Sequence, residues 1–191
     1  MKKIMISACL SLGMLSGQAI AQTCAADLIQ STPTERFIAS VDNSEVLDTK
    51  TNLVWRRCAL GYVQDSGSCI DDPDASNDKW NWMNVTKWQM SKLRSVAQGE
   101  WRLPNIKELN SITEQTCESP ALNLNVFYDA PENSGQYMSN TPNVNDNREM
   151  KAVDVNTGNI KNIRKDQTSY YRIVREPSAQ EITTFGAVVI D

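Results

Sequence analysis

The sequence predicts a mixed α+β domain that is cross-linked by disulfide bonds, and three observations support this. Runs of apolar and β-branched residues flank turn residues in the segments 46–58 and 151–164. Between these segments, residues 80–97 and the residues after Asn105 have apolar side chains at helical spacing. The cysteines that follow the first 21 residues are even in number, as is usual for disulfide-bonded exported proteins, and they are Cys24, Cys58, Cys69 and Cys117.

The first 21 residues are typical of a secretory signal peptide. Lys2 and Lys3 precede an apolar stretch at residues 4–15, and Ala19-Ile20-Ala21 offers a small-x-small cleavage pattern. Cleavage there would leave Gln22 as the first residue, with no membrane span in the mature chain. We therefore expect a periplasmic, secreted or cell-surface location.

Composition excludes several functional classes. The chain has 19 basic and 23 acidic residues and no histidine. An acidic exported chain is a poor candidate for nucleic-acid binding. The lack of histidine excludes Ser-His-Asp and Cys-His catalysis and every metal site with a histidine ligand. No pair of carboxylates is singled out by its spacing for glycosidase chemistry. We therefore expect a protein that is not an enzyme and has no cofactor.

The length of 191 residues suits one domain with a single core. We expect an N-terminal arm at residues 22–35, pinned mainly by Cys24, a domain at residues 36–176 and an apolar tail at residues 177–191. Residues 183–190 of the tail are strongly β-prone, and such a segment is a pairing hazard when exposed. We favour a strand added to the domain's own sheet. The alternatives are pairing with a partner chain, which would make an oligomer, and disorder.

The spacing of the cysteines favours one pairing. Cys58 and Cys69 flank a short polar loop, so a local bridge between them closes at a low entropic cost. Cys24 and Cys117 would then join the N-terminal arm to the end of the central helix. A zinc site with four thiolates is the alternative, but the chain lacks the C-x-x-C spacing of such sites.

The domain begins with a strand and a hairpin. Residues 36–41 have the pattern of a strand that ends at the turn residues 42–44. Residues 46–48 and 53–58 flank a polar turn, which predicts a β-hairpin.

An acidic loop follows the hairpin. Hard cations prefer several oxygen ligands from one loop, so the loop is a candidate calcium site. Its spacing differs from that of known calcium loops, and the alternative is a solvated loop that caps the next helix. The candidate ligands are Asp71, Asp72, Asp74 and Asp78.

The first helix is expected at residues 80–97. Most of its apolar residues form one stripe and are expected in the core. Trp80 and Trp88 lie off this stripe and are candidates for stacking on a sugar.

The second helix is expected to start at Asn105, within the stretch Trp101–Leu109. Asn105 and Glu108 have the spacing of a capping box, and Pro104 disfavours helical geometry at the residue before it. We expect Trp101 and Leu103 in the core.

Arg102 could be taken for an anion-binding or catalytic residue. The helix start next to it is already explained by capping, so Arg102 is expected to brace a neighbouring carboxylate or carbonyl. Function is therefore expected on the loops and strands after Pro120, where apolar residues up to Tyr128 dock a loop on the core.

The remainder of the chain is rich in strands. We expect strands at residues 136–141, 151–155, 160–164 and 170–175, with a hairpin turn at residues 156–159. Basic residues outnumber acidic ones between residues 142 and 175, so these strands could present a basic face to an anionic glycan. The alternative is an ordinary solvated strand face. The candidate ligand-binding residues are Lys151, Lys161, Arg164, Lys165 and Arg172.

Several segments carry a family resemblance that spans nearly all of residues 36–175. They are the hairpin that contains Trp55, the helix start at Trp101–Leu109, and the segments 119–127, 139–142 and 171–175. In sequence and order they are similar to the Lcl C-terminal domain family of exported bacterial proteins. The Arg-Leu-Pro helix start also resembles the C-type-lectin-like fold shared by formylglycine-generating enzymes. The resemblance implies two helices packed on a twisted antiparallel sheet. Asn52 replaces the family's glycine and can adopt the same left-handed geometry.

The resemblance implies a binding module that acts outside the cytoplasm, in adhesion to a surface carbohydrate or an envelope protein. A structural or assembly subunit is the alternative, motivated by the apolar tail at residues 183–190. A formylglycine-generating-type enzyme is a third hypothesis. It requires reactive, metal-binding thiols, whereas the cysteines here are placed like structural bridges.

Overall fold

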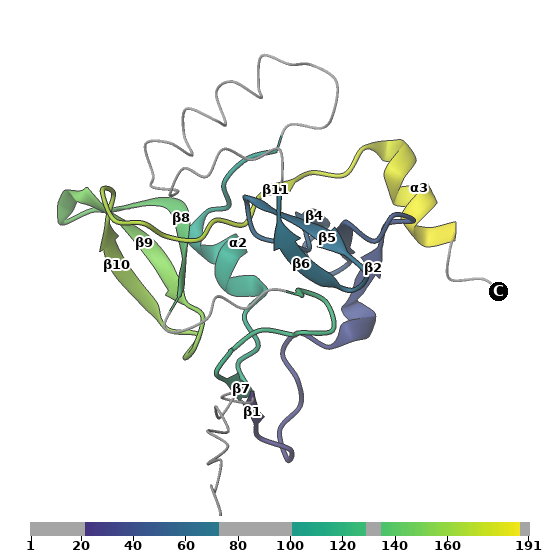
Figure 1. The fold of residues 1–191 in the computed structure, drawn as a ribbon, viewed down its shortest axis with the longest axis horizontal. Helices are drawn as coiled ribbons and strands as arrows, with labels where there is room; N and C mark the ends of the chain where they lie inside the picture. The colour runs from purple at the N-terminus through teal and green to yellow at the C-terminus, as the bar shows by residue number, and fades with distance from the viewer. Residues whose placement is uncertain (1–21, 73–100, 129–134, 188–191) are drawn as a thin grey trace, which may run out of the picture.

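The computed structural model describes residues 22–72, 101–128 and 135–187 (Figure 1). The expected signal peptide, the expected helix at residues 80–97 with its tryptophans, and the end of the tail lie outside the described residues. Asp74 and Asp78 of the acidic loop lie outside them as well.

Three strands from the first part of the chain and the last strand form a four-stranded antiparallel sheet in the order β11-β4-β3-β2. Its members are β2 (Phe37–Ala39), β3 (Glu45–Asp48), β4 (Leu53–Arg56) and β11 (Val174–Arg175). The predicted hairpin is confirmed, with Val46 opposite Trp55. Asn52 in its turn has a φ of 54°, the left-handed geometry expected of it. The first strand is shorter than predicted at both ends, because Arg36 belongs to the 3-10 helix η1 (Thr34–Arg36) and the turn begins after Ala39.

A second antiparallel sheet contains β8 (Gln136–Asn143), β9 (Asp146–Asp154) and β10 (Ile160–Arg164) in the order β10-β9-β8. The turn predicted between β9 and β10 is confirmed. Gly158 in this turn has a φ of 72°, and a Cβ added there would lie 2.8 Å from Thr113 Cγ2. A glycine is therefore required at this position by both conformation and space.

The strand predicted at residues 170–175 is wrong for most of its length, because only β11 is a regular strand. The segment before it runs between the two sheets and bonds to each in turn. The Met138 amide of β8 donates to the Tyr170 carbonyl, whereas the Arg56 amide of β4 donates to the Ile173 carbonyl. Residues 170–173 therefore join the sheets instead of extending one of them.

Two small two-stranded antiparallel sheets complete the described strands. They are β5 (Tyr62–Asp65) with β6 (Ser68–Asp71), and β1 (Thr23–Cys24) with β7 (Cys117–Glu118). The expected single sheet is thus replaced, within the described residues, by four separate antiparallel sheets. The expected α+β class is confirmed at the level of short helices and antiparallel strands.

Helix α2 (Ile106–Ser111) starts as the sequence predicts. The Asn105 side chain accepts from the amides of Lys107 and Glu108, and the Glu108 carboxylate accepts from the Asn105 amide at 2.8 Å. The capping box is therefore confirmed.

The strand predicted in the tail is wrong, because Ala179–Ala187 form helix α3. A second capping box starts this helix. The Ser178 amide donates to Glu181 Oε2 at 2.8 Å, and the Glu181 amide donates to Ser178 Oγ at 3.2 Å. Phe185 is buried with Leu47 and Val54 of the four-stranded sheet, so helix α3 covers one face of that sheet (Figure 1).

The core has two main clusters. One contains Trp55, Phe127 and the apolar side of α2, and the other contains Leu103, Met150 and Ile163. Leu103 is buried and Trp101 is partly buried against the second cluster, as expected of core anchors. None of the helices in the described part of the chain is long and apolar enough to cross a membrane.

Candidate ligand-binding surface

Arg172 is a core residue, so the prediction that it binds a ligand is wrong. Its exposed fraction is 0%. Its Nη1 donates to the carbonyls of Arg56 and Arg57 at 2.7 and 2.6 Å, and its Nη2 donates to the Tyr137 hydroxyl at 2.9 Å. Its guanidinium also lies over the rings of Phe127 and Tyr137. These partners surround the charged group and keep it away from solvent.

The other predicted ligand-binding residues lie on or next to the β9–β10 pair, and they are Lys151, Lys161, Arg164 and Lys165. The strand register places Lys151 and Arg164 on one face and Lys161 on the other. Lys161 Nζ lies 2.7 Å from Asp154 Oδ2, and Arg164 Nη2 lies 2.6 Å from Asp166 Oδ2. The expected basic face is therefore divided between two faces, and these two ion pairs offset part of its charge.

The candidate calcium ligands are only partly described. Asp71 is exposed at the end of β6, and Asp72 is half-buried. Among the residues that the structure describes, no three His, Cys, Asp or Glu side chains are grouped as a metal site would require.

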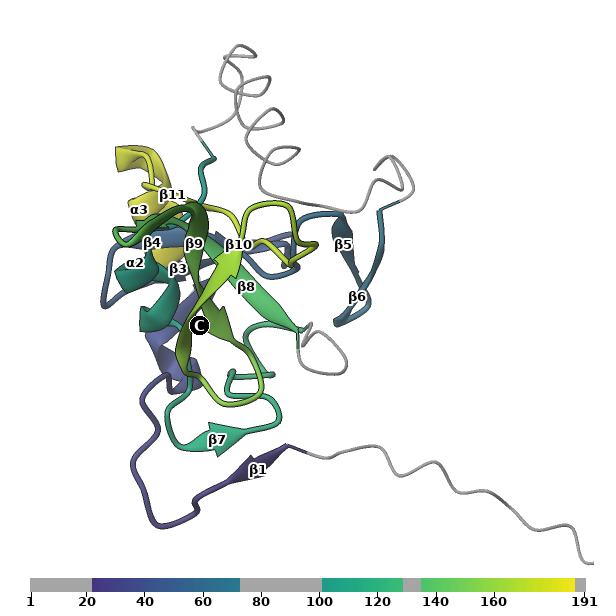
Figure 2. The same cartoon turned by 90° about the vertical axis from the view of Figure 1, so that its left-hand side faces the viewer.

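The two disulfides join the cysteines in the pairing that the sequence favours. Cys24 bonds to Cys117, and Cys58 bonds to Cys69. The second bridge fixes the β5–β6 hairpin next to the end of β4. The first joins β1 to β7, at the edge of the molecule where the arm lies (Figure 2).

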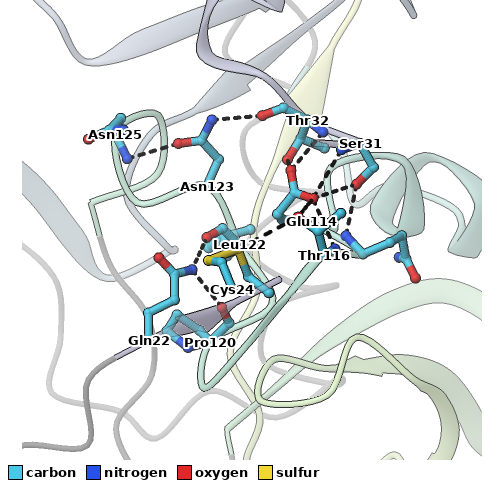
Figure 3. Close-up of a disulfide and its surroundings, with 12 residues drawn as sticks. Gln22, Cys24, Ser31, Thr32, Glu114, Thr116, Pro120, Leu122, Asn123 and Asn125 are labelled. Carbon is cyan, nitrogen blue, oxygen red and sulfur yellow. Dashed lines mark hydrogen bonds between the residues drawn. A yellow bond between two sulfur atoms is a disulfide. The ribbon is translucent and has the colours of Figure 1, made fainter. Parts of the chain in front are cut away.

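The N-terminal arm is held by more than Cys24, contrary to expectation. Figure 3 shows the buried carboxylate of Glu114 among donors from the arm and from its own loop. The amides and hydroxyls of Ser31, Thr32 and Thr116 donate to it at 2.7–3.1 Å. Burial by itself would raise the pKa of Glu114, but these bonds outweigh it and lower the pKa to about 2.

Two side-chain amides add to this attachment. Gln22 Nε2 donates to the carbonyls of Pro120 and Leu122, both at 2.7 Å, and Asn123 Nδ2 donates to the Thr32 carbonyl at 2.7 Å (Figure 3). The arm and the loop at residues 114–123 therefore form one bonded unit.

Arg102 braces carboxylates, as expected. Its Nη1 and Nη2 donate to Glu108 at 2.9 Å each, and Nη2 also donates to Glu176 at 2.9 Å. Burial would raise the pKa of Glu108, but the bonds from Arg102 and the Asn105 amide hold it below its ordinary value. Arg102 therefore joins the start of α2 to the end of β11.

Arg57 brings together two loops that are far apart in the sequence. Its Nε donates to the Val126 carbonyl at 2.7 Å and its Nη2 to the Asn125 carbonyl at 2.8 Å. Its Nη1 donates to Asn43 Oδ1 in the turn after β2. Arg57 is buried, and burial lowers the pKa of its guanidinium. Its hydrogen bonds thus hold the turn and the loop side by side.

The Arg57 guanidinium also supports an aromatic ring. It lies 3.8 Å from the ring centroid of Tyr128, and Asn43 Nδ2 donates to the Tyr128 hydroxyl at 2.9 Å. Tyr128 itself is half-buried. We call Asn43, Arg57 and Tyr128 the Tyr128 platform. It holds a partly exposed ring in one orientation.

The turn that supplies Asn43 to the Tyr128 platform also exposes a carboxylate and an apolar side chain. Ser40 Oγ donates to Asp42 Oδ1 at 2.6 Å, and Ser44 Oγ donates to Asp42 Oδ2 at 2.8 Å. These bonds orient Asp42 and lower its pKa. Val41 next to it is 87% exposed.

The sequence contains no signal for the Tyr128 platform. Arg57 lies in a predicted strand, Asn43 in a predicted turn and Tyr128 at the end of a loop expected on the core. Their proximity depends on hydrogen bonds from one side chain to backbone carbonyls near residue 126, which no local pattern encodes.

Comparison with known proteins identifies one family. The model of the Lcl C-terminal domain matches residues 44–175, which is more than half of the chain. The match includes the hairpin, helix α2, the second sheet and β11. No curated protein and no solved structure matches the chain.

Proposed function

Because the chain belongs to the Lcl C-terminal domain family, we propose that it is a non-catalytic binding domain at the cell envelope, with a carbohydrate as its ligand and adhesion as its role. The single observation that carries this proposal is the Tyr128 platform. A partly exposed aromatic ring on a rigid frame is suited to stacking on a ligand, since little conformational entropy is lost on binding.

The state of the acidic residues supports a role without catalysis. A carboxyl group that acts as a general acid benefits from a raised pKa. In the described part of the chain, burial acts to raise the pKa of many carboxyl groups, but hydrogen bonds and cationic partners outweigh it. Those with a pKa clearly displaced from its ordinary value are all lowered, and they are Asp42, Asp48, Glu108, Glu114, Asp146, Asp154, Asp166, Glu176 and Glu181.

The two disulfides support a location outside the cytoplasm, either periplasmic or on the cell surface. N-terminal sequencing of the exported protein tests the export route. A mature chain that starts at Gln22 is expected, and an uncleaved chain in the cytoplasm would contradict the proposed location.

A C-type-lectin-like fold is part of the proposal. The Trp101–Pro104 helix start and the order of hairpin, helix and strand-rich second half support it. An experimental structure of the whole exported chain tests it by superposition on C-type-lectin-like domains. A different strand order around α2 would contradict it.

A glycan array probed with the exported chain, with and without added calcium, tests the carbohydrate ligand. Binding to a restricted set of glycans is expected. An array on which no glycan is bound in either condition would contradict the proposal. Binding that requires calcium would direct attention to the acidic loop that begins at Asp71.

An anionic glycan is one version of this ligand, and it would use the face of β9 and β10 that carries Lys151 and Arg164. Retention on heparin across a salt series tests it, with a Lys151→Ala and Arg164→Ala double variant as comparison. Earlier elution of the double variant would support this version. No retention of the unmodified chain at low salt would exclude it.

A further inference from the structure

We infer that the Tyr128 platform and Asp42 form a binding site for an uncharged sugar ring. This rests on the proposed function and deepens it, because it names the residues that bind and the chemical class of the ligand.

The ring of Tyr128 supplies the stacking surface. Arg57 is buried and lies against one face of the ring, so the exposed part of Tyr128 belongs to its other face and its edge. Aromatic faces stack on the C–H groups of sugar rings through apolar contact. The bond from Asn43 and the guanidinium beneath the ring both restrict its rotation. The surface is therefore held in place before a ligand arrives.

The hydroxyl of Tyr128 and the carboxylate of Asp42 supply the polar contacts. Tyr128 Oη accepts a bond from Asn43, which leaves its own hydrogen to donate to a ligand, and no acceptor for it occurs among the described residues. Asp42 accepts from Ser40 and Ser44, and its oxygens have further acceptor capacity. A donor on the ring itself and an exposed acceptor on the residue before Asn43 match the hydroxyl groups of a sugar.

Charge selects an uncharged sugar over ionic ligands. The Asp42 carboxylate repels sulfated and carboxylated glycans, which is the opposite of what the basic face of β9 and β10 would do. The Arg57 cation beneath the ring opposes a second cation on its outer face, so amines and quaternary ammonium groups are disfavoured. A neutral pyranose is repelled by neither the Asp42 carboxylate nor the Arg57 cation.

The test uses isothermal titration calorimetry of the exported chain with cellopentaose, maltopentaose and chitopentaose as neutral probes and a heparin pentasaccharide as the anionic probe. We expect binding to at least one neutral probe. Tyr128→Ala should weaken it by about tenfold or more, because stacking is lost. Asp42→Asn should weaken it by about tenfold, because a charge-assisted bond becomes a neutral one.

Matched controls separate this site from general effects. Asp65→Asn removes the same charge from another exposed turn, and Lys107→Ala removes an exposed cation from α2; both should leave neutral-probe affinity unchanged. Tyr128→Phe keeps the ring and removes the hydroxyl, so its loss should be smaller than that of Tyr128→Ala. Since Tyr128→Ala could disturb the loop, Asp42→Asn and Tyr128→Phe provide a test on surface groups alone.

Three results would overturn the inference. The first is that no neutral probe binds. The second is that Asp42→Asn and Tyr128→Phe both leave the affinity for the neutral probe unchanged. The third is that Asp65→Asn lowers this affinity as much as Asp42→Asn does. If only the heparin probe binds, the site and ligand class inferred here are wrong while the proposed function stands. If the exported chain also binds no glycan on the array, both this inference and the proposed function are wrong.

Discussion

Buried arginine side chains connect segments that are distant in the sequence. Arg36 binds Asp48, Arg57 binds the loop near residue 126, Arg172 binds the end of β4, and Arg175 binds Glu45 and Glu181. A guanidinium has five donors in a rigid plane, so it can bond to several segments at once. At the residue scale, the fold depends on these side chains as well as on apolar packing.

The role of Arg172 can be tested by stability. Arg172→Ala leaves the carbonyls of Arg56 and Arg57 without their buried donor, so we expect the free energy of unfolding to fall by more than about 3 kcal/mol. Arg164→Ala, at an exposed ion pair, should change it by less than about 1 kcal/mol. Urea unfolding followed by tryptophan fluorescence measures both. Equal stability of the two variants would restore Arg172 as a candidate for binding.

The Glu114 carboxylate should make stability depend on pH. Its pKa is lowered from 4.5 to about 2 in the folded protein. A lowered folded pKa means that the stabilisation is fully present above pH 4.5 and is lost as pH falls toward 2. At neutral pH this amounts to about 3 kcal/mol. Urea unfolding of the unmodified chain and of Glu114→Gln should show a stability difference that shrinks over this range.

Glu118→Gln is the matched control for that experiment. Glu118 is exposed in β7, close in sequence to Glu114, so its substitution should leave the pH dependence unchanged. A stability difference between the unmodified chain and Glu114→Gln that stays constant down to acid pH would contradict the role assigned to Glu114.

At the scale of elements, α3 shows how packing and capping override β-propensity. Residues 183–187 have a β-prone sequence, yet Ser178 and Glu181 start a helix and Phe185 is buried in one cluster with Leu47 and Val54. The Ser-x-x-Glu capping box at residues 178–181 was present in the sequence and would have predicted a helix start.

The attachment of α3 can be tested by substitution of its buried side chain. Phe185→Ala should lower the free energy of unfolding by about 3 kcal/mol and speed amide exchange within α3, because the contact with the sheet is lost. Ile182→Ala is the control, since Ile182 is exposed on the same helix. Equal effects of the two substitutions would contradict this packing.

Deletion of residues 178–191 tests the alternative of an assembly subunit. Because Phe185 packs within its own chain, we expect size-exclusion chromatography to give the same oligomeric state with and without the segment. A smaller oligomer after the deletion would favour assembly through the tail.

At the scale of the whole molecule, the two disulfides constrain the chain over different lengths. Their sequence separations are 93 residues for Cys24–Cys117 and 11 residues for Cys58–Cys69. Loop-closure entropy predicts losses of about 4.7 and 2.8 kcal/mol when each pair is replaced by alanine. Urea unfolding of the two double variants measures which replacement lowers the free energy of unfolding more. A larger loss for the Cys58–Cys69 pair would contradict the entropic account.

Much of the fold follows from signals within short segments. The hairpin of β3 and β4, the turn between β9 and β10, and the capping box at Asn105 each depend on a few adjacent residues. The favoured cysteine pairing follows from the low cost of closing a short loop. The basic face could not be predicted in this way, because it was inferred from a count of charges. Such a count does not say which side chains are buried, and Arg172 is buried.

The sequence alone therefore determined the α+β class, the starts of elements, the disulfide pairing that it favoured and the family resemblance, because backbone preferences and chain closure act locally. Only the tertiary structure decided that Arg172 is core and that the strands divide into separate sheets. It also placed Asn43, Arg57 and Tyr128 together. The physical reason is that burial and long-range hydrogen bonds depend on how distant segments pack, which no local pattern contains.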